Sequence, residues 1–381
     1  MSYFHLNFIL KGKLTVCCLL MLSAMPLNAQ REAKQIGDFK ESISLNEHLR
    51  GTKRTLQYRP DGDEFVCVNG KNRYTRALYG SHSPFRVETS DRPVFAFYNN
   101  GRGGNISFKV ILRDGTELAL DCTGHCESRY SAGKRTYYLT DPSWGKGELR
   151  ISVLALADMD GAIWRFSPSN MPKGAILRWQ HGGATGKRLS RNGDMGVDPA
   201  DCFELPAEAT DLVTGELPLQ KEVYLVRGEV PEDYNVRKLY QQAEAASLAL
   251  ASHLKIETPD PYLNTLGGAL VAAADGIWDG QVWLHGAIGW RMPLSGWRAG
   301  YTGDALGWHD RARTHFDAYA ASQVTDVPNT IPHPAQDSTM NLARSEKRWG
   351  TPQYSNGYIC RNPGRNNQMH HYDMNLCYMD E

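Results

Sequence analysis

WRMPLSGWRAGYTGDALGWHDRAR, residues 290–313, interleaves aromatic rings with arginines, acids and glycines. Glycines let a backbone turn sharply, so rings and charges this close in sequence can converge on one point. Aromatic faces that stack on sugar rings, with arginines and carboxylates that hold hydroxyls, are typical of concave carbohydrate sites. The structural alternative is a buried connector whose charges pair with one another. The pattern favours the ligand site, because titratable groups gather at functional clefts.

The candidate site residues all come from this stretch. The predicted catalytic carboxylates are Asp304 and Asp310. The residues predicted to bind substrate are Trp290, Arg291, Trp297, Arg298, Tyr301 and His309. The alternative role for Asp304 is to cap a helix that begins at Ala305, since aspartate is a favoured N-cap.

The chain between residues 56 and 232 reads as short strands separated by turns. The apolar or alternating runs lie at 65–68, 85–88, 94–98, 106–112, 149–154, 162–166, 175–179 and 223–226. Turn dipeptides such as Asn69-Gly70 and Asp114-Gly115 separate several of these runs. Many short strands without helical interludes predict an antiparallel β-sandwich.

Helical spacing begins after the strands. Residues 234–254 repeat apolar side chains at helical spacing and predict a linker helix. After the Pro259/Pro261 break, residues 263–278, 304–321 and 367–381 predict further helices. We expect Trp278, Trp283 and Trp308 to be exposed, because the helices from 263 onward lack most of the neighbours that would cover them.

A β-sandwich, a linker helix and then helices with an aromatic cleft resembles the six-hairpin glycosidases, in which an (α/α)6 toroid follows a β-sandwich. Inverting α-L-rhamnosidases of that class carry a segment of the type PQRDERLGWTGD, and residues 293–304 read PLSGWRAGYTGD. The matching residues are Pro293, Arg298, Gly300, Thr302, Gly303 and Asp304. The resemblance implies that Asp304 lines the catalytic pocket. The family's general acid falls on Trp297, whose indole is no proton donor for a glycosidic oxygen. The overall layout resembles the large uncharacterised secreted six-hairpin proteins of saccharolytic bacteria.

These observations predict a multidomain chain, β then α, that holds only the first helices of an incomplete toroid. Twelve helices of about 11–12 residues each, with loops, need more chain than follows Pro261. The predicted segments are a signal peptide (1–29), a lead-in (30–55), the β-sandwich (56–232), the linker helix (233–258) and the truncated start of the α/α toroid (259–381).

The first 29 residues predict export to the periplasm or the extracellular space. Lys11 and Lys13 precede a short apolar core at 14–22, and Ala29 offers a cleavage point. That core is too short for a transmembrane helix, which needs about 20 residues. The chain has 42 basic and 42 acidic residues, so its charge gives no argument for a nucleic-acid partner.

No cofactor or metal is predicted. Cys122, His125 and Cys126 lack the second ligand pair of a structural zinc site, and Cys122 and Cys126 are the candidates for a disulfide in an oxidising compartment. Adjacent histidines such as His370 and His371 point in different directions on a helix.

The leading functional hypothesis is the N-terminal portion of a secreted glycoside hydrolase that acts on complex polysaccharide and is inactive as this chain. Its partner would be an oligo- or polysaccharide, and the oligomeric state stays open. A polysaccharide lyase is the alternative, because Tyr301 or His309 offers a base and Arg298 a cation beside a uronate. A carbohydrate-binding protein without catalysis is the third reading.

Overall fold

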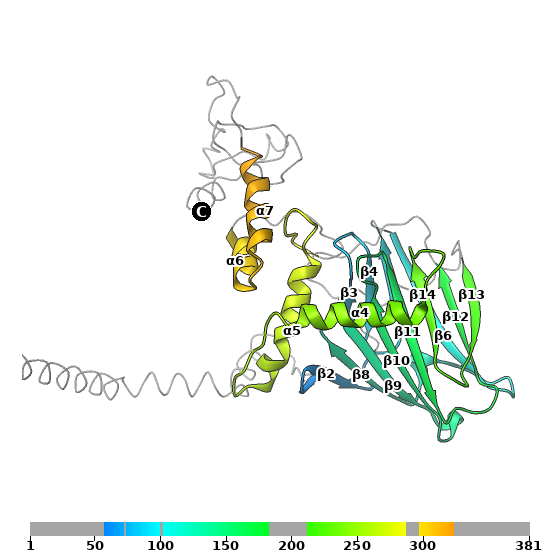
Figure 1. Ribbon diagram of the computed structural model, residues 1–381. Coiled ribbons are helices and arrows are strands. Elements are labelled where there is room, and N and C mark those ends of the chain that lie inside the picture. The colour runs from blue at the N-terminus through cyan, green and yellow to red at the C-terminus, as the bar shows by residue number, and fades with distance from the viewer. Residues whose placement is uncertain (1–56, 72–73, 100–101, 183–211, 287–296, 324–381) are drawn as a thin grey trace, which may run out of the picture. The chain divides into compact units, whose positions relative to one another are not determined.

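The computed structural model describes residues 57–71, 74–99, 102–182, 212–286 and 297–323. These residues form two antiparallel β-sheets followed by four α-helices (Figure 1). The predicted order of a β-sandwich and then helices is therefore confirmed. The predicted signal peptide, Trp290, Arg291 and the predicted helix at 367–381 lie outside the described residues. Within the described ranges, no helix combines the length and the hydrophobicity that crossing a membrane requires.

The first sheet has seven strands in the order β1-β2-β8-β9-β10-β11-β14. All neighbours are antiparallel, and β10 pairs with β11 from Glu148 opposite Ser169 to Ala155 opposite Ala162. The strands are β1 (Arg59–Asp61), β2 (Glu64–Val68), β8 (His125–Ser131), β9 (Lys134–Thr140), β10 (Glu148–Ala155), β11 (Gly161–Ser169) and β14 (Val223–Gly228).

The second sheet runs β13-β12-β6-β5-β4-β3, with β7 paired to one part of β6. Its strands are β3 (Tyr74–Leu78), β4 (Arg86–Ser90), β5 (Phe95–Asn99), β6 (Arg102–Ile111), β7 (Glu117–Ala119), β12 (Ile176–Gly182) and β13 (Val213–Pro218). Two short 3-10 helices, η1 (Leu120–Cys122) and η2 (Pro142–Trp144), connect strands. All eight predicted strand runs are confirmed.

The core lies where the two sheets face each other. Trp164 of β11 is fully buried, and the rings of Phe95, Phe97 and Phe108 from the second sheet lie 5.6–6.2 Å from its ring. Since side chains alternate along a strand, Ile163 faces the opposite side of the first sheet from Trp164. Both sides of β11 are buried, which explains its nearly continuous apolar sequence.

The outer side of the first sheet is covered by α4 (Val236–Ala251) (Figure 1). Asn235 caps this helix, its side chain accepting a hydrogen bond from the Lys238 N–H. Leu239, Tyr240 and Ala243 pack against Ile163 and its apolar neighbours. The helix predicted at residues 234–254 is therefore confirmed.

The next helix, α5 (Pro261–Gly276), begins with Pro261 after the cap Asp260, whose carboxylate accepts from the Tyr262 N–H at 2.8 Å. The Thr265 hydroxyl bonds the Gly62 carbonyl at 2.9 Å, which ties α5 to the β1–β2 turn. The predicted helix at 263–278 is confirmed, beginning two residues earlier.

The predicted helix at 304–321 is wrong in its start and its continuity. Two helices occupy this region, α6 (Trp297–Ala305) and α7 (His309–Ala320). Gly307 adopts φ +73°, which interrupts the helical hydrogen-bond pattern and leaves Trp308 as the N-cap of α7. Asp304 lies in the last turn of α6, so it does not cap a helix.

Two further expectations are corrected. Trp278 and Trp283 are buried, because their rings pack against each other in a tilted arrangement, 4.7 Å apart, and against Ala312 of α7. Trp308 is partly buried against the same cluster. Cys122 and Cys126 do not form a disulfide: Cys122 is exposed, whereas Cys126 is buried in the core, so their sulfurs face different surroundings.

Candidate functional site

The predicted catalytic carboxylates lie at the surface of the α6–α7 pair. Oδ1 of Asp304 is 3.0 Å from Nδ1 of His309, so these two predicted residues come together across the break between the helices. Asp310 has a side chain that is 98% exposed, and its carboxylate is 3.9 Å from Arg313. Tyr301 is exposed on α6. The side chains of Trp297 and Arg298 lie outside what the structure describes.

Arg311 of α7 connects this segment to the rest of the molecule. Its guanidinium lies 4.3 Å from the centre of the Trp308 ring and 5.8 Å from that of Trp278, close enough for cation–π contact. The His253 ring meets Trp308 edge-on at 5.6 Å. These contacts hold the start of α7 against the cluster of Trp278 and Trp283, which follow α5 in the sequence.

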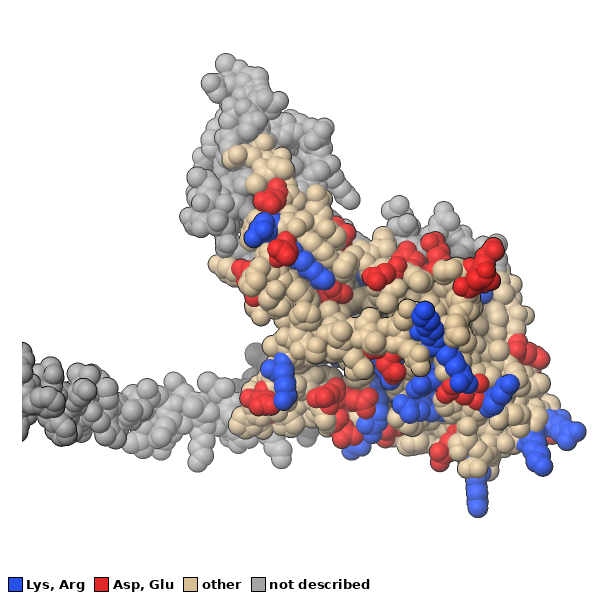
Figure 2. Space-filling view, in the orientation of Figure 1, with Lys and Arg blue, Asp and Glu red and all other residues tan. Residues whose placement is uncertain are grey.

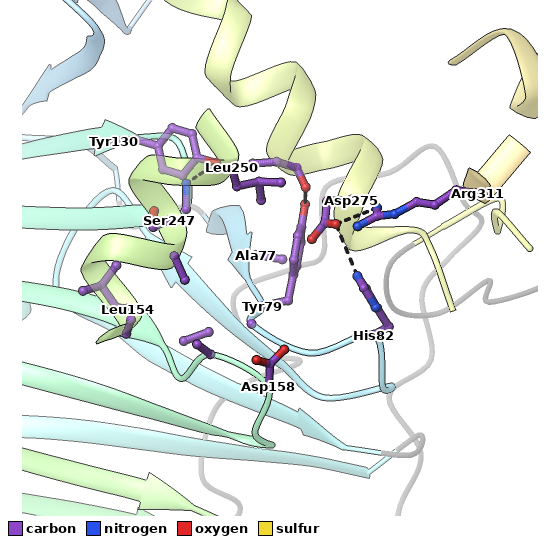
Figure 3. Close-up of a pocket in the computed structure, with 17 residues that line it drawn as sticks. Ala77, Tyr79, His82, Tyr130, Leu154, Asp158, Ser247, Leu250, Asp275 and Arg311 are labelled. Atoms are coloured by element: carbon purple, nitrogen blue, oxygen red, sulfur yellow. Dashed lines mark hydrogen bonds and ion pairs between the residues drawn. The ribbon is translucent and has the colours of Figure 1, made fainter. Parts of the chain in front are cut away.

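A cavity of about 210 Å³ lies where β3, the β10–β11 turn, α4 and α5 approach each other, and Arg311 contributes to its wall (Figure 3). We call it the junction cavity. Its polar lining includes Tyr79, His82, Asp158, Asp275 and Arg311, and its apolar lining includes Ala77, Leu154, Ala246 and Leu250.

Three charged or titratable side chains meet at Asp275, at the end of α5. Oδ1 of Asp275 accepts from Nη1 of Arg311 at 2.7 Å and lies 3.2 Å from Nε2 of His82 (Figure 3). Burial by itself would raise the pKa of Asp275, but the hydrogen bonds from His82 and Arg311 outweigh it and hold that pKa below its usual value. Asp275 is therefore an ionised acceptor within a largely buried site.

Tyr79 forms the wall between the sheet and α5. Its hydroxyl donates to the Ala272 carbonyl, and burial raises the pKa of this phenol, so it stays protonated as a donor. The Arg86 guanidinium lies 4.7 Å from the ring centre and donates to the Gly276 carbonyl at 2.6 Å. A Cβ on Gly276 would overlap the Tyr79 ring, so glycine is required for this close approach.

Asp158 lines the cavity from the β10–β11 turn. It adopts φ 56°, a left-handed conformation that Asp and Asn tolerate better than most residues, and its N–H donates to the Gly80 carbonyl at 2.8 Å. On the face in Figure 2, acidic and basic side chains are interspersed. Among the described residues, no three His, Cys, Asp or Glu side chains gather as a metal site would require.

Sequence reasoning missed most of this site. Arg311 lies in the stretch that predicted a binding site, although it was not among the residues assigned to substrate. His82 and Asp275 are 193 positions apart, and so are Tyr79 and Ala272, so no local pattern joins them. The one local signal is Tyr79-Gly80-Ser81-His82, a polar turn between two strand runs.

A family model described as a domain of unknown function (DUF4450) matches residues 100–229. The matched segment contains β6 to β14 and therefore most of the two sheets, but none of the helices. It includes Asp158 and Leu154 of the junction cavity and excludes His82, Asp275 and Arg311. A comparison with curated proteins finds no match to this chain. About a third of the chain thus resembles a family whose description states no function.

Proposed function

We propose that this chain is the sugar-binding part of an exported glycoside hydrolase that acts on complex polysaccharide, and that alone it cleaves no glycosidic bond. The observation that carries the proposal is the position of Arg311. This residue lies seven positions after the rhamnosidase-like segment of residues 293–304, and it lines the junction cavity together with Asp275 and His82. Guanidinium, carboxylate and imidazole groups are suited to hydrogen-bond sugar hydroxyls, and tryptophan rings beside them are suited to stack on sugar rings.

The absence of cleavage follows from the carboxylates. Inverting hydrolysis needs two carboxyl groups about 6.5–9.5 Å apart, one of them protonated in a shielded site. Asp310 is almost fully exposed and Asp304 is more than half exposed, so neither has such shielding. The position that carries the acid in the resembling family holds Trp297.

Co-sedimentation of the full chain with insoluble plant and host polysaccharides, together with an assay for released reducing sugar, tests the proposal. We expect retention on at least one polysaccharide, no sugar release, and weaker retention for Arg311→Ala. Arg313→Ala is the matched control, because its side chain lies on the same helix and is 74% exposed. Sustained sugar release that Asp304→Ala abolishes would refute the claim of no cleavage, and retention on none of the polysaccharides would refute sugar binding.

Export is part of the proposal, to the periplasm or beyond the cell. N-terminal sequencing of the mature protein from an expressing bacterium should begin at Gln30. A mature chain that retains residues 1–29 in the cytosol would contradict export.

A lyase is the second candidate, and the contact between Asp304 and His309 favours it. A carboxylate 3.0 Å from an imidazole can orient that imidazole as a base for the proton beside a uronate carboxyl. Products with a new unsaturated end, absorbing in the ultraviolet and lost in His309→Ala, would support the lyase over the hydrolase.

A further inference from the structure

We propose that the junction cavity binds one neutral sugar ring, the end unit of a glycan chain, and discriminates against uronates. This inference rests on the proposed sugar-binding function and adds the class of sugar and the residues that select it.

The size of the cavity limits the ligand to a single ring. Pockets that enclose drug-sized ligands measure about 300–1,000 Å³. The junction cavity, at about 210 Å³, is smaller than this range. A single sugar ring fits such a space, whereas two linked rings do not, so the cavity would take the end of a glycan rather than its middle.

The hydrogen-bonding groups of the cavity suit hydroxyls. Both contacts of Asp275 use Oδ1, and within the described part of the chain its Oδ2 and the Asp158 carboxylate accept no hydrogen bond. Arg311 uses only Nη1 on Asp275, so its remaining N–H groups are donors without an acceptor among the described residues. A hydroxyl both donates and accepts. A ligand with several hydroxyls therefore satisfies the carboxylates and the guanidinium together.

The charge of the lining disfavours an acidic sugar. Two carboxylates, Asp158 and Asp275, face the single guanidinium of Arg311. These three groups together carry one net negative charge. A uronate would add a third carboxylate, and in a partly buried site like charges repel more strongly than they do in bulk water. A neutral ring meets no such penalty.

The apolar side of the cavity provides a surface for the C–H face of a ring. Leu154, Leu250 and Ala246 line the cavity, and Ala246 is an exposed residue of α4. A large side chain at position 246 would fill the cavity without removing any of its polar groups. Position 249, on an exposed part of the same helix, does not line the cavity and offers a matched control.

The test is titration calorimetry of the full chain with matched pairs of methyl glycosides: glucoside and glucuronide, galactoside and galacturonide, with the rhamnoside added. We expect the affinity for at least one neutral glycoside to exceed that for its uronate by about tenfold or more, as repulsion by one unit charge implies. Ala246→Trp should abolish this binding, and Ala249→Trp should leave it unchanged. Asparagine tolerates the φ of 56° at position 158. Asp158→Asn should therefore weaken binding of the neutral glycoside and reduce the difference in affinity between the neutral glycoside and its uronate.

Four results would overturn the inference. Tighter binding of a uronate than of its neutral partner contradicts the charge argument. Glycoside binding that survives Ala246→Trp places the ring elsewhere. Polysaccharide retention that neither Ala246→Trp nor Asp158→Asn changes would mean that the proposed function stands but that the cavity does not bind the sugar. If the chain is retained on no polysaccharide and binds no glycoside, both the proposed function and this inference are wrong.

Discussion

The ion pair between Asp275 and Arg311 should couple α7 energetically to α5, and a double-mutant cycle measures that coupling. A hydrogen bond to a charged group contributes about 1.5–3 kcal/mol when it is shielded, and an exposed ion pair contributes about 0–1 kcal/mol. The side chains here are 17% and 25% exposed and the N–O distance is 2.7 Å. This intermediate burial gives an expected coupling energy of about 1–2 kcal/mol.

The cycle compares the wild type with Asp275→Ala, Arg311→Ala and the double variant. Arg311→Ala should lower the unfolding free energy by more than the coupling energy, because it also removes the contact with the Trp308 ring, which contributes about 0.5–1 kcal/mol. Urea denaturation followed by tryptophan emission reports on this region, since Trp278 and Trp308 lie beside the pair. Arg313→Ala should change the unfolding free energy by less than about 0.5 kcal/mol, because that side chain is exposed.

Additive effects would refute the reasoning. Independent sites add within about 0.3–0.5 kcal/mol, so a coupling energy inside that range would mean that the Asp275–Arg311 contact does not hold the helices together.

Three further predictions concern acidity and close packing. Burial first, and the nearby Arg227 second, lower the pKa of His181 from 6.5 to about 4. Between these pH values the unfolded chain binds a proton that the folded chain does not. The Tm should therefore fall as the pH drops from 6.5 to 4, and His181→Gln should flatten this dependence. Because the pKa of Asp275 is lowered in the folded chain, its contribution is fully present above its ordinary value of 3.8 and is lost as the pH falls through the lower pKa of the folded chain. The Asp275–Arg311 coupling energy should therefore decrease as the pH falls below 3.8 in the same urea cycle. Gly276→Ala places a Cβ 1.8 Å from Cζ of Tyr79, so it should lower the unfolding free energy by about 1–3 kcal/mol in urea and weaken glycoside binding in calorimetry. A constant Tm from pH 6.5 to 4 would contradict the first expectation. A coupling energy that does not change as the pH falls below 3.8 would contradict the second, and a Gly276→Ala variant as stable as wild type would contradict the third.

The fold could be predicted from the sequence where burial is strong. Strands such as β6 and β10 carry nearly continuous or alternating apolar residues, so their positions were evident. β8 and β9 were missed, although they form a central hairpin closed at Gly133. The buried positions of β8 are Cys126, Ser128 and Tyr130, and this row is only weakly apolar. A hydrophobic pattern cannot identify a strand whose buried row includes polar residues.

The α6–α7 region shows a different limit. The periodicity of residues 304–321 correctly indicated helix, but it did not show that a left-handed Gly307 would divide the segment. The candidate site was predictable only in part, because Arg311 belongs to a conspicuous polar stretch whereas its partners are distant in sequence. His82 and Asp275 converge through the packing of α5 against the sheets, which no local pattern encodes.

The central claim is that the junction cavity holds a sugar ring, and hydrogen–deuterium exchange of the full chain with and without its neutral glycoside tests it most directly. The account predicts slower exchange in peptides that contain Tyr79 to His82, Ala246 to Leu250, Asp275 and Arg311, with no change across β12 and β13. Protection confined to peptides outside the cavity, or none at a glycoside concentration that calorimetry shows to be saturating, would contradict it.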